Sequence, residues 1–214
     1  MFCEILATGS PSNCTLLNDG MVAVDCGVPF SVLRERHKKL QVVILTHEHG
    51  DHFNGATIKR LAVERPSLRF CSPEWLVPEL SKLVDKQNID IIGMGDTMDY
   101  GLFSVKAFSL IHDVPNAGYL ITFDPKSSIK TVFYATDCNS LEGIDAKCCD
   151  LYLIEGNYSA ADILERIRQK YDAGEYVYEW RVIKNHLSVE KAELFIANNA
   201  GPNSKYILMH GHVD

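Results

Sequence analysis

The sequence predicts an α/β (α+β) fold in which two β-sheets pack against each other with helices on the outside. Short apolar strand patterns occur in two batches, and helical patterns follow each batch. A hydrophobic content of 46% with 23% charged residues is ordinary for a globular chain. No repeat, low-complexity tract or linker divides the sequence, so we expect a single domain over residues 1–214.

The first half of the chain alternates short apolar runs with turns. Asn18-Asp19-Gly20 is typical of a tight hairpin turn between two strands. A helix is predicted over residues 30–39, where His37 lies in a basic run and is expected to be exposed to solvent. Helical spacing also marks residues 73–86, with Pro78 kinking the start. The strands of this half are expected over residues 2–7, 14–17, 21–24 and 41–46.

The second half contains the longer strand patterns and two late helices. One helix is predicted over residues 159–170, and another follows Ser188 as its N-cap and stops near Gly201. The strands of this half are expected over residues 89–92, 102–111, 119–123, 131–135, 151–154 and 205–210.

Charge and hydropathy exclude some classes of function. The formal net charge of −7 argues against a protein that coats long nucleic acid, because such binding needs many clustered cations. It does not exclude cutting of a nucleic acid end or a nucleotide, where bound metals supply the positive charge. No apolar run approaches the ~20 residues of a membrane span. The N-terminal residues lack a secretory signal, so we expect a cytoplasmic protein with no membrane partner.

Seven cysteines are spread through the chain in an odd count. No CxxC pair offers zinc-finger spacing, and adjacent cysteines make no useful cross-link. We expect reduced, mostly buried thiols, with Cys138 behaving as a small hydrophobic residue close to the site described below.

The segment Thr46-His47-Glu48-His49-Gly50-Asp51-His52 carries the chemical signal. Three imidazoles and a carboxylate within six residues directly follow the predicted buried strand. Packed imidazoles repel one another when they are protonated, whereas divalent cations need neutral imidazole nitrogens and ionised carboxylates as ligands. In a loop at a strand end, His47 and His49 can face one ion while Asp51 and His52 reach a second. The segment therefore predicts a dinuclear metal site.

The pattern His47-x-His49-x-Asp51-His52 resembles the signature of the metallo-β-lactamase superfamily. The resemblance implies a four-layer αββα sandwich with its metal site at one edge of the two sheets. It extends along nearly the whole chain in the family's order, and the later matching residues are Asp25, His112, Asp137 and His210.

Each matching residue has a role that the resemblance implies. Asp25 would brace the metal loop. The first metal would be bound by His47, His49, His112 and Asp137, and the second by Asp51, His52, Asp137 and His210. These nitrogen and oxygen ligands suit two divalent ions per chain, with zinc expected and manganese or iron as alternatives to it. His212 competes with His210 for the last position, and we prefer His210 because it directly ends an apolar strand.

Two details indicate a branch of this superfamily. His49 stands where diiron oxygen-reducing members have glutamate, which disfavours such a centre. The triplet His186-Leu187-Ser188 before a helix resembles a phosphodiesterase branch that includes 5′→3′ exonuclease-like proteins, cyclic phosphodiesterases and, more distantly, tRNA 3′ endonucleases. In that branch the histidine contacts the phosphate. Glu155 and Asn157 resemble the same branch as a strand-end acid and a residue that orders the surroundings of the metals.

Arg181 and Lys184 precede His186 and would favour a phosphate. Solvated charges on a helix or strand surface explain them equally well. An alternative interpretation of His186 is that it merely precedes the N-terminus of a helix and has no role in the reaction.

The predicted reaction is metal-assisted hydrolysis of a phosphodiester. Two cations lower the pKa of a bridging water, which yields hydroxide near neutral pH, and they polarise a phosphoryl oxygen during in-line attack. Asp51 or Asp137 is expected to orient the nucleophile. A protonated His186 would stabilise the developing charge or donate a proton to the leaving oxygen.

Two other functions compete with this one. A thioester or lactone hydrolase of the same fold would use the same ligands; against it, four residues follow His210, so we see no C-terminal helical domain of the glyoxalase type. A non-catalytic, metal-bearing nucleotide-binding protein is the third hypothesis, although a scaffold has no need of an open dinuclear site.

The substrate stays open among a nucleic acid end, a cyclic nucleotide and a small phosphodiester. We recognise no long inserted arm of the kind that grips tRNA, which disfavours the tRNA endonucleases. The sequence leaves the oligomeric state open, with a homodimer among the options.

Overall fold

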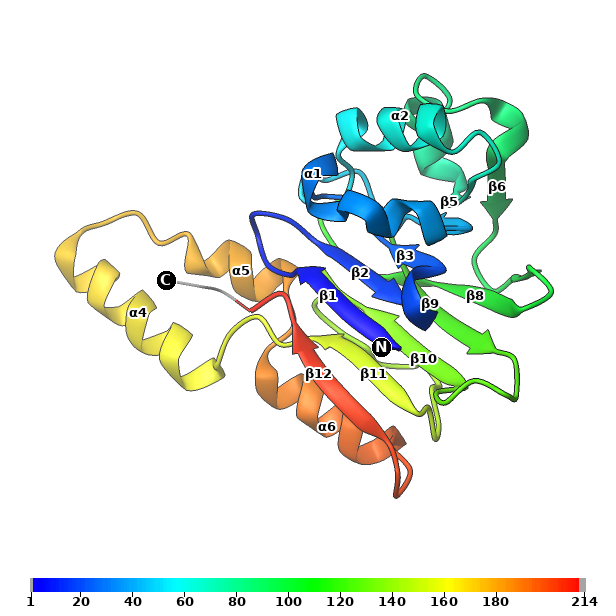
Figure 1. Ribbon diagram of the computed structural model, residues 1–214. Helices are drawn as coiled ribbons and strands as arrows, with labels where there is room; N and C mark the ends of the chain where they lie inside the picture. The colour runs from blue at the N-terminus through cyan, green and yellow to red at the C-terminus, as the bar shows by residue number, and fades with distance from the viewer. Residues whose placement is uncertain (1, 212–214) are drawn as a thin grey trace.

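The computed structural model describes residues 2–211, and within them two six-stranded sheets pack face to face (Figure 1). The first sheet follows the order of the chain. Its first three strands are antiparallel, and the third to the sixth are parallel. They are β1 (Cys3–Ala7), β2 (Cys14–Leu17), β3 (Val22–Val24), β4 (Val42–Ile44), β5 (Arg69–Pro73) and β6 (Ile89–Ile92).

The second sheet also keeps neighbouring strands adjacent. Its first four strands form an antiparallel meander, and its last three are parallel. They are β7 (Thr97–Asp99), β8 (Phe103–Leu110), β9 (Asn116–Phe123), β10 (Thr131–Ala135), β11 (Leu151–Glu155) and β12 (Lys205–Met209). The expected strands are thus confirmed, and β5 and β7 are additions to them.

Alternation along the strands builds three apolar cores, because successive side chains of a strand point to opposite faces. Val42 and Ile44 of β4 face the second sheet, while Val43 faces outward. In β10, Tyr134 faces the first sheet and Phe133 faces outward. The central strands of both sheets are therefore apolar on both faces and need a covering layer of helices.

Helices provide that layer on each side and complete the predicted αββα sandwich. α1 (Phe30–Leu33), α2 (Gly55–Glu64) and α3 (Val77–Leu80) cover the first sheet, and α6 (Val189–Asn199) packs on β11 and β12 (Figure 1). Among residues 2–211, no helix has the length and apolar character that crossing a membrane requires.

The helices of the first half differ from the expectation. The helix predicted over residues 30–39 ends after one turn, because Arg34 adopts a φ of 42°, and a 3₁₀ helix follows to Lys39. The segment 73–86 likewise contains only a 3₁₀ turn and the short α3. α2 is an addition, capped by the Asn54 side chain, which accepts a hydrogen bond from the Thr57 amide.

The expected exposure of His37 is wrong. Its side chain is buried against Phe30, with ring centroids 4.9 Å apart, and its Nδ1 contacts the carbonyl of Arg34. The tight 3₁₀ turn folds the imidazole back onto the helix layer, which the basic neighbours in the sequence do not indicate. All seven cysteines are free thiols and five are buried, as expected.

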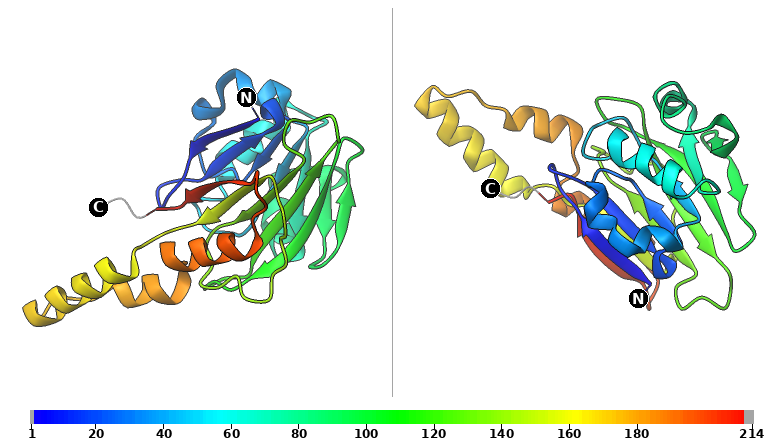
Figure 2. Two further views of the ribbon diagram at one scale, coloured as in Figure 1. Left: turned by 90° about the horizontal axis from the view of Figure 1, so that it is seen from below. Right: turned by 45° about the horizontal axis from the view of Figure 1, so that its top comes forward.

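Two further helices form a hairpin that stands clear of the sheets. α4 (Ala160–Ala173) leaves β11, and α5 (Glu179–Asn185) returns the chain towards the body (Figure 2). Ser159 caps α4, and Gly174 ends it in the left-handed conformation. We call residues 159–185 the α4–α5 hairpin. The sequence predicts its first helix but not α5 or the projection.

Candidate metal centre

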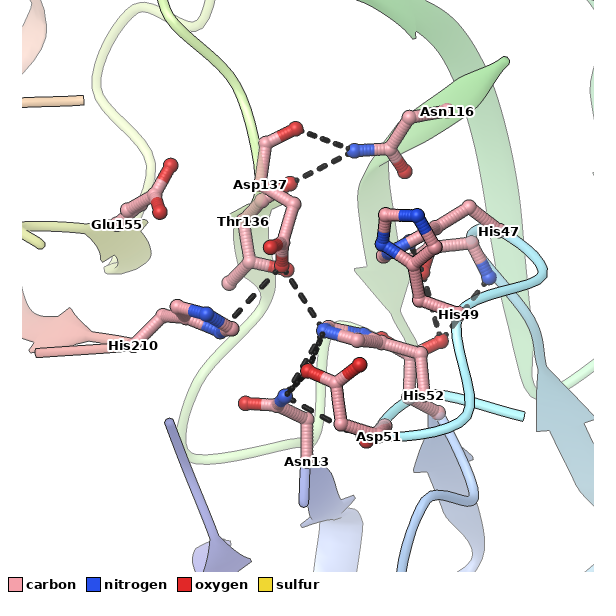
Figure 3. A network of polar contacts seen from close by, with 12 residues as sticks. Asn13, His47, His49, Asp51, His52, Asn116, Thr136, Asp137, Glu155 and His210 are labelled. Carbon is pink, nitrogen blue, oxygen red and sulfur yellow. Dashed lines mark hydrogen bonds and ion pairs between the residues drawn. The ribbon is translucent and has the colours of Figure 1, made fainter. Parts of the chain in front are cut away.

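Every predicted metal ligand lies at or just beyond the C-terminal end of a strand. The motif loop follows β4, and His112, Asp137 and His210 follow β8, β10 and β12. These last three strands run in the same direction within the second sheet, so their ends share one edge. The sandwich therefore collects residues that are far apart in the sequence at one edge (Figure 3).

Three of these strand ends have an unusual backbone. Asp25, Asp137 and His210 adopt φ values of 60°, 56° and 54°, in the left-handed region that non-glycine residues rarely occupy. Each such residue costs on the order of 1–3 kcal/mol and persists only where its surroundings fix it. The shared conformation turns each side chain back across the end of the sandwich, which indicates a site that is held under strain.

Asp25 fixes the motif loop, as the resemblance implies. Its Oδ1 accepts hydrogen bonds from the amide and the hydroxyl of Thr46, at 3.0 and 2.9 Å. Its Oδ2 lies 2.6 Å from Nδ1 of His52, and all three residues are fully buried. Because Asp25 occupies Nδ1, His52 presents Nε2 to the site.

Gly27 and Asn13 hold the other side of the loop. A Cβ on Gly27 would lie 1.7 Å from the backbone carbonyl oxygen of Asp51, so only glycine lets the loop pack there. The buried Asn13 amide donates to Oδ2 of Asp51 at 3.1 Å and lies 2.8 Å from Nε2 of His52 (Figure 3). Asn13 thus orients two predicted ligands.

Asn116 positions the loop that carries Asp137. Its side-chain amide donates to the carbonyls of Thr136 and Asp137, at 2.9 and 2.6 Å (Figure 3). Asp137 then projects between the two groups of histidines, with its Oδ2 2.9 Å from Nε2 of His52 and 3.4 Å from Nδ1 of His210. This central position suits a carboxylate that is shared by two ions.

The predicted ligands form overlapping groups whose donor atoms lie within 4.8 Å of one another. One group is His47, His49 and His112, and another is Asp51, His52 and His210. Asp137 groups with His47 and His52, and also with His210. The structure therefore brings together all seven residues that the sequence predicts as ligands, and it also groups Glu155 and His186 with Asp137 and His210.

The protonation of two of the predicted ligands, His47 and His210, also fits divalent ions. Burial lowers the pKa of His47 to about 2 and that of His210 to about 4, so both imidazoles are neutral and have a free lone pair at neutral pH. Burial alone would raise the pKa of Asp137, but the neighbouring His52 outweighs it and holds that pKa well below its usual range. No hydrogen bond satisfies the buried Nε2 of His47 or Nδ1 of His210. Buried polar atoms without partners are costly, and metal coordination would satisfy both.

His186 and Glu155 form a pair beside this centre. Nδ1 of His186 lies 2.6 Å from Oε1 of Glu155 and 3.7 Å from Oδ1 of Asp137. Oε2 of Glu155 accepts hydrogen bonds from the amides of Cys138 and Leu187, so the carboxylate is fixed although it is fully buried. Burial raises the pKa of Glu155 to about 7. Burial alone would lower the pKa of His186, but the hydrogen bond and charge of Glu155 raise it above its ordinary value.

A pocket of about 430 Å³ opens over the centre. One wall consists of predicted ligands and His186, and the other is a face of α5 that includes Arg181. Arg181 donates to Oδ2 of Asp113 at 3.0 Å, next to the ligand His112. Lys184 is exposed and is not among the described residues that line the pocket. Of the two cations that the sequence offers for a phosphate, the structure brings only Arg181 to the site.

Several site residues have no signal of their own in the sequence. Asn13 and Asn116 act through hydrogen bonds to segments 38 and 20 residues away, and no local pattern marks such pairs. The resemblance to the phosphodiesterase branch indicates Glu155 and Asn157. Asn157 donates to the carbonyl of His210 at 2.8 Å, and Glu155 contacts His186. His212, the alternative last ligand, lies outside the described residues.

The chain matches a known protein family over most of its length. Residues 22–211 match the family described as the beta-lactamase superfamily domain. The chain is 29% identical to an exodeoxyribonuclease, WalJ of Streptococcus pneumoniae, over 228 aligned positions that cover 98% of this chain and 80% of that protein.

Solved structures show the same fold. The metallo-β-lactamase fold protein YhfI from Bacillus subtilis has a TM-score of 0.71 at 21% identity, with 99% of this chain and 87% of that chain covered. The short form of human tRNase Z has a TM-score of 0.68 at 19% identity, with 99% and 92% covered. The family match spans most of the chain. This chain therefore belongs to the metallo-β-lactamase superfamily.

Proposed function

We propose that this protein is a dinuclear metal-dependent phosphodiesterase that hydrolyses nucleic acid, with the end of a DNA strand as its expected substrate. The observation that carries the proposal is the His186–Glu155 pair beside the seven grouped ligands. Nδ1 of His186 contacts the buried carboxylate of Glu155 and lies 3.7 Å from Asp137, and the imidazole lines the pocket. His186 is therefore placed to contact a phosphate in the pocket rather than only to bind a metal.

The metal ligands divide into two sets around the shared Asp137. His47, His49 and His112 would bind the first ion, and Asp51, His52 and His210 the second. Zinc is the expected ion, since the donors are mainly imidazoles with few carboxylates, and manganese or iron would fit the same donors. When bound, two such ions supply Lewis acidity and lower the pKa of a shared water.

The residues of the chain contribute orientation and proton transfer. Asp51 and Asp137 line the pocket and can orient a water for in-line attack. His186 has a raised pKa because Glu155 holds it, so near neutral pH it can donate a proton to the departing oxygen. Glu155 accepts two backbone hydrogen bonds and therefore keeps the imidazole in place as the charge shifts.

The relatives support a nucleic acid as the substrate class. The exodeoxyribonuclease WalJ matches nearly the whole of this chain, and the tRNase Z structure shares its fold. The net charge of −7 is compatible with this class because the metals, rather than the surface, would attract the phosphate.

A substrate panel with a His186→Ala variant tests the proposal. We expect the metal-loaded protein to hydrolyse bis(p-nitrophenyl) phosphate and DNA oligonucleotides faster than thioester or lactone substrates. His186→Ala should lower phosphodiester turnover by ~10²-fold or more, the range for loss of a general acid. Metal content should change little if the ions are held by the seven predicted ligands; a parallel loss of metal would instead assign His186, which lies within 4.8 Å of Asp137 and His210 donor atoms, to the ligands.

Each other outcome has a definite meaning. Faster hydrolysis of thioesters or lactones would replace the proposal with the second hydrolase hypothesis. Stoichiometric nucleotide binding without any turnover would indicate a binding protein. Full activity of His186→Ala would remove this residue from the mechanism.

A further inference from the structure

The α4–α5 hairpin is joined to the candidate metal centre by hydrogen bonds. At the end of α5, the carbonyl of Asn185 lies 3.1 Å from Nδ1 of His112, and the Asn185 side chain donates to Asp113 at 3.2 Å. Arg181, one turn earlier, bonds to the same carboxylate. The root of the hairpin is therefore fixed to the loop that carries a metal ligand, while its tip projects from the body (Figure 2).

One face of the hairpin forms a wall of the pocket. Tyr178, Arg181, Val182 and Asn185 line it, and their spacing places them on one face of α5. A polymer whose reacting phosphate lies at the metal centre and whose chain leaves on this side must pass along the hairpin.

Exposed aromatic side chains concentrate on the same segment. Among residues 2–211, five large aromatic side chains are exposed, and four of them fall within residues 171–180. Tyr171 and Tyr176 are 78% and 85% exposed, and Trp180 is 58% exposed. Leaving so much aromatic surface in water is unfavourable, so this concentration indicates a binding surface.

The charge of the hairpin differs from that of the rest of the chain. Its cations are Arg166, Arg168, Lys170, Arg181 and Lys184, and its carboxylates are Asp162, Glu165, Asp172, Glu175 and Glu179. The hairpin is thus neutral on a chain with a net charge of −7. A polyanion that reaches the pocket meets less repulsion along the hairpin than over the remaining surface.

We propose that the α4–α5 hairpin binds the single-stranded nucleic acid segment that adjoins the phosphate to be cleaved. Bases stack on the exposed aromatic rings, and backbone phosphates contact Arg168 and Arg181. Aromatic rings interspersed with cations suit single strands, because every base of a single strand has an accessible flat face. Bases within a duplex are stacked on each other and offer no such face. This inference rests on the proposed function and adds the surface that positions the polymer.

A Tyr171→Ser/Tyr176→Ser double variant tests the inference. Both side chains are exposed near the tip, so folding and metal content should persist. We expect the KM for single-stranded DNA and RNA oligonucleotides to rise by about tenfold or more, from the loss of stacking, with kcat less affected. Hydrolysis of bis(p-nitrophenyl) phosphate, which is too small to reach the tip, should change less than about twofold. Tyr206→Ser, at an exposed tyrosine on β12, is the matched control and should alter neither activity.

Fluorescence anisotropy with a labelled single strand separates two kinds of failure. Hairpin-dependent binding without hydrolysis by the wild-type protein would keep this inference and refute the proposed function. Hydrolysis with an unchanged oligonucleotide KM in the double variant would refute the inference alone. An equal loss on the small diester and the oligonucleotide would also overturn it, as would hairpin-dependent self-association with unchanged affinity for the strand.

Discussion

Replacing Asp137 with alanine should remove phosphodiester hydrolysis almost completely. Asp137 groups with His47 of the first predicted ion and with His52 and His210 of the second, and its position between them is fixed by Asn116. Changes to residues that merely orient ligands already cost about 10–100-fold in affinity or activity. Loss of the shared ligand itself should exceed that range and should lower the bound metal per chain.

The measurement is turnover of bis(p-nitrophenyl) phosphate with metal content determined on the same sample. Asp145→Ala is the matched control, because Asp145 is an exposed carboxylate on the same segment between β10 and β11. Near-normal turnover and metal content in Asp137→Ala would mean that the carboxylate is not a shared ligand.

The second large effect is expected from Gly27→Ala. The added Cβ would lie 1.7 Å from the carbonyl oxygen of Asp51 and 2.9 Å from the amide nitrogen of His52, and both are backbone atoms. The motif loop must therefore move away from β3. We expect a loss of at least about 1–3 kcal/mol in the free energy of unfolding, the usual cost of overpacking. Because Asp51 and His52 move with the loop, the second metal should be lost first.

Urea denaturation and metal analysis check this prediction. Gly50→Ala is the matched control within the same loop, since no atom lies within 4 Å of the Cβ that it would add. The proposed role of Gly27 would be wrong if Gly27→Ala kept the wild-type urea denaturation midpoint and metal content while Gly50→Ala lost them.

The sequence indicates the centre itself because its ligands are local or stand at strand ends. His47, His49, Asp51 and His52 are adjacent, so their residue types alone predict metal binding. His112, Asp137 and His210 are isolated in sequence, and the resemblance to the superfamily connected them to the motif. The structure places them together because strands running in one direction end at one edge.

Two of the supporting residues, Asn13 and Asn116, could not be predicted, for a physical reason. Asn13 and Asn116 act through side-chain hydrogen bonds across the fold, and an isolated asparagine has no periodicity that marks such a role. The exposure expected for His37 was wrong because it was inferred from the basic residues next to it in the sequence. Burial depends instead on the residues that surround the side chain in space. The sequence does not predict α5 because the helix is short and follows an aromatic loop. Its position beside the site is seen from its contact with His112.

The most direct test is to count the metal ions bound by the purified wild-type protein, before and after reconstitution with zinc or manganese. The account predicts about two ions per chain, as a two-metal hydrolase requires. The same preparation should hydrolyse bis(p-nitrophenyl) phosphate and lose that activity with a chelator. A protein that remains metal-free after reconstitution would contradict the central claim, whatever its other properties.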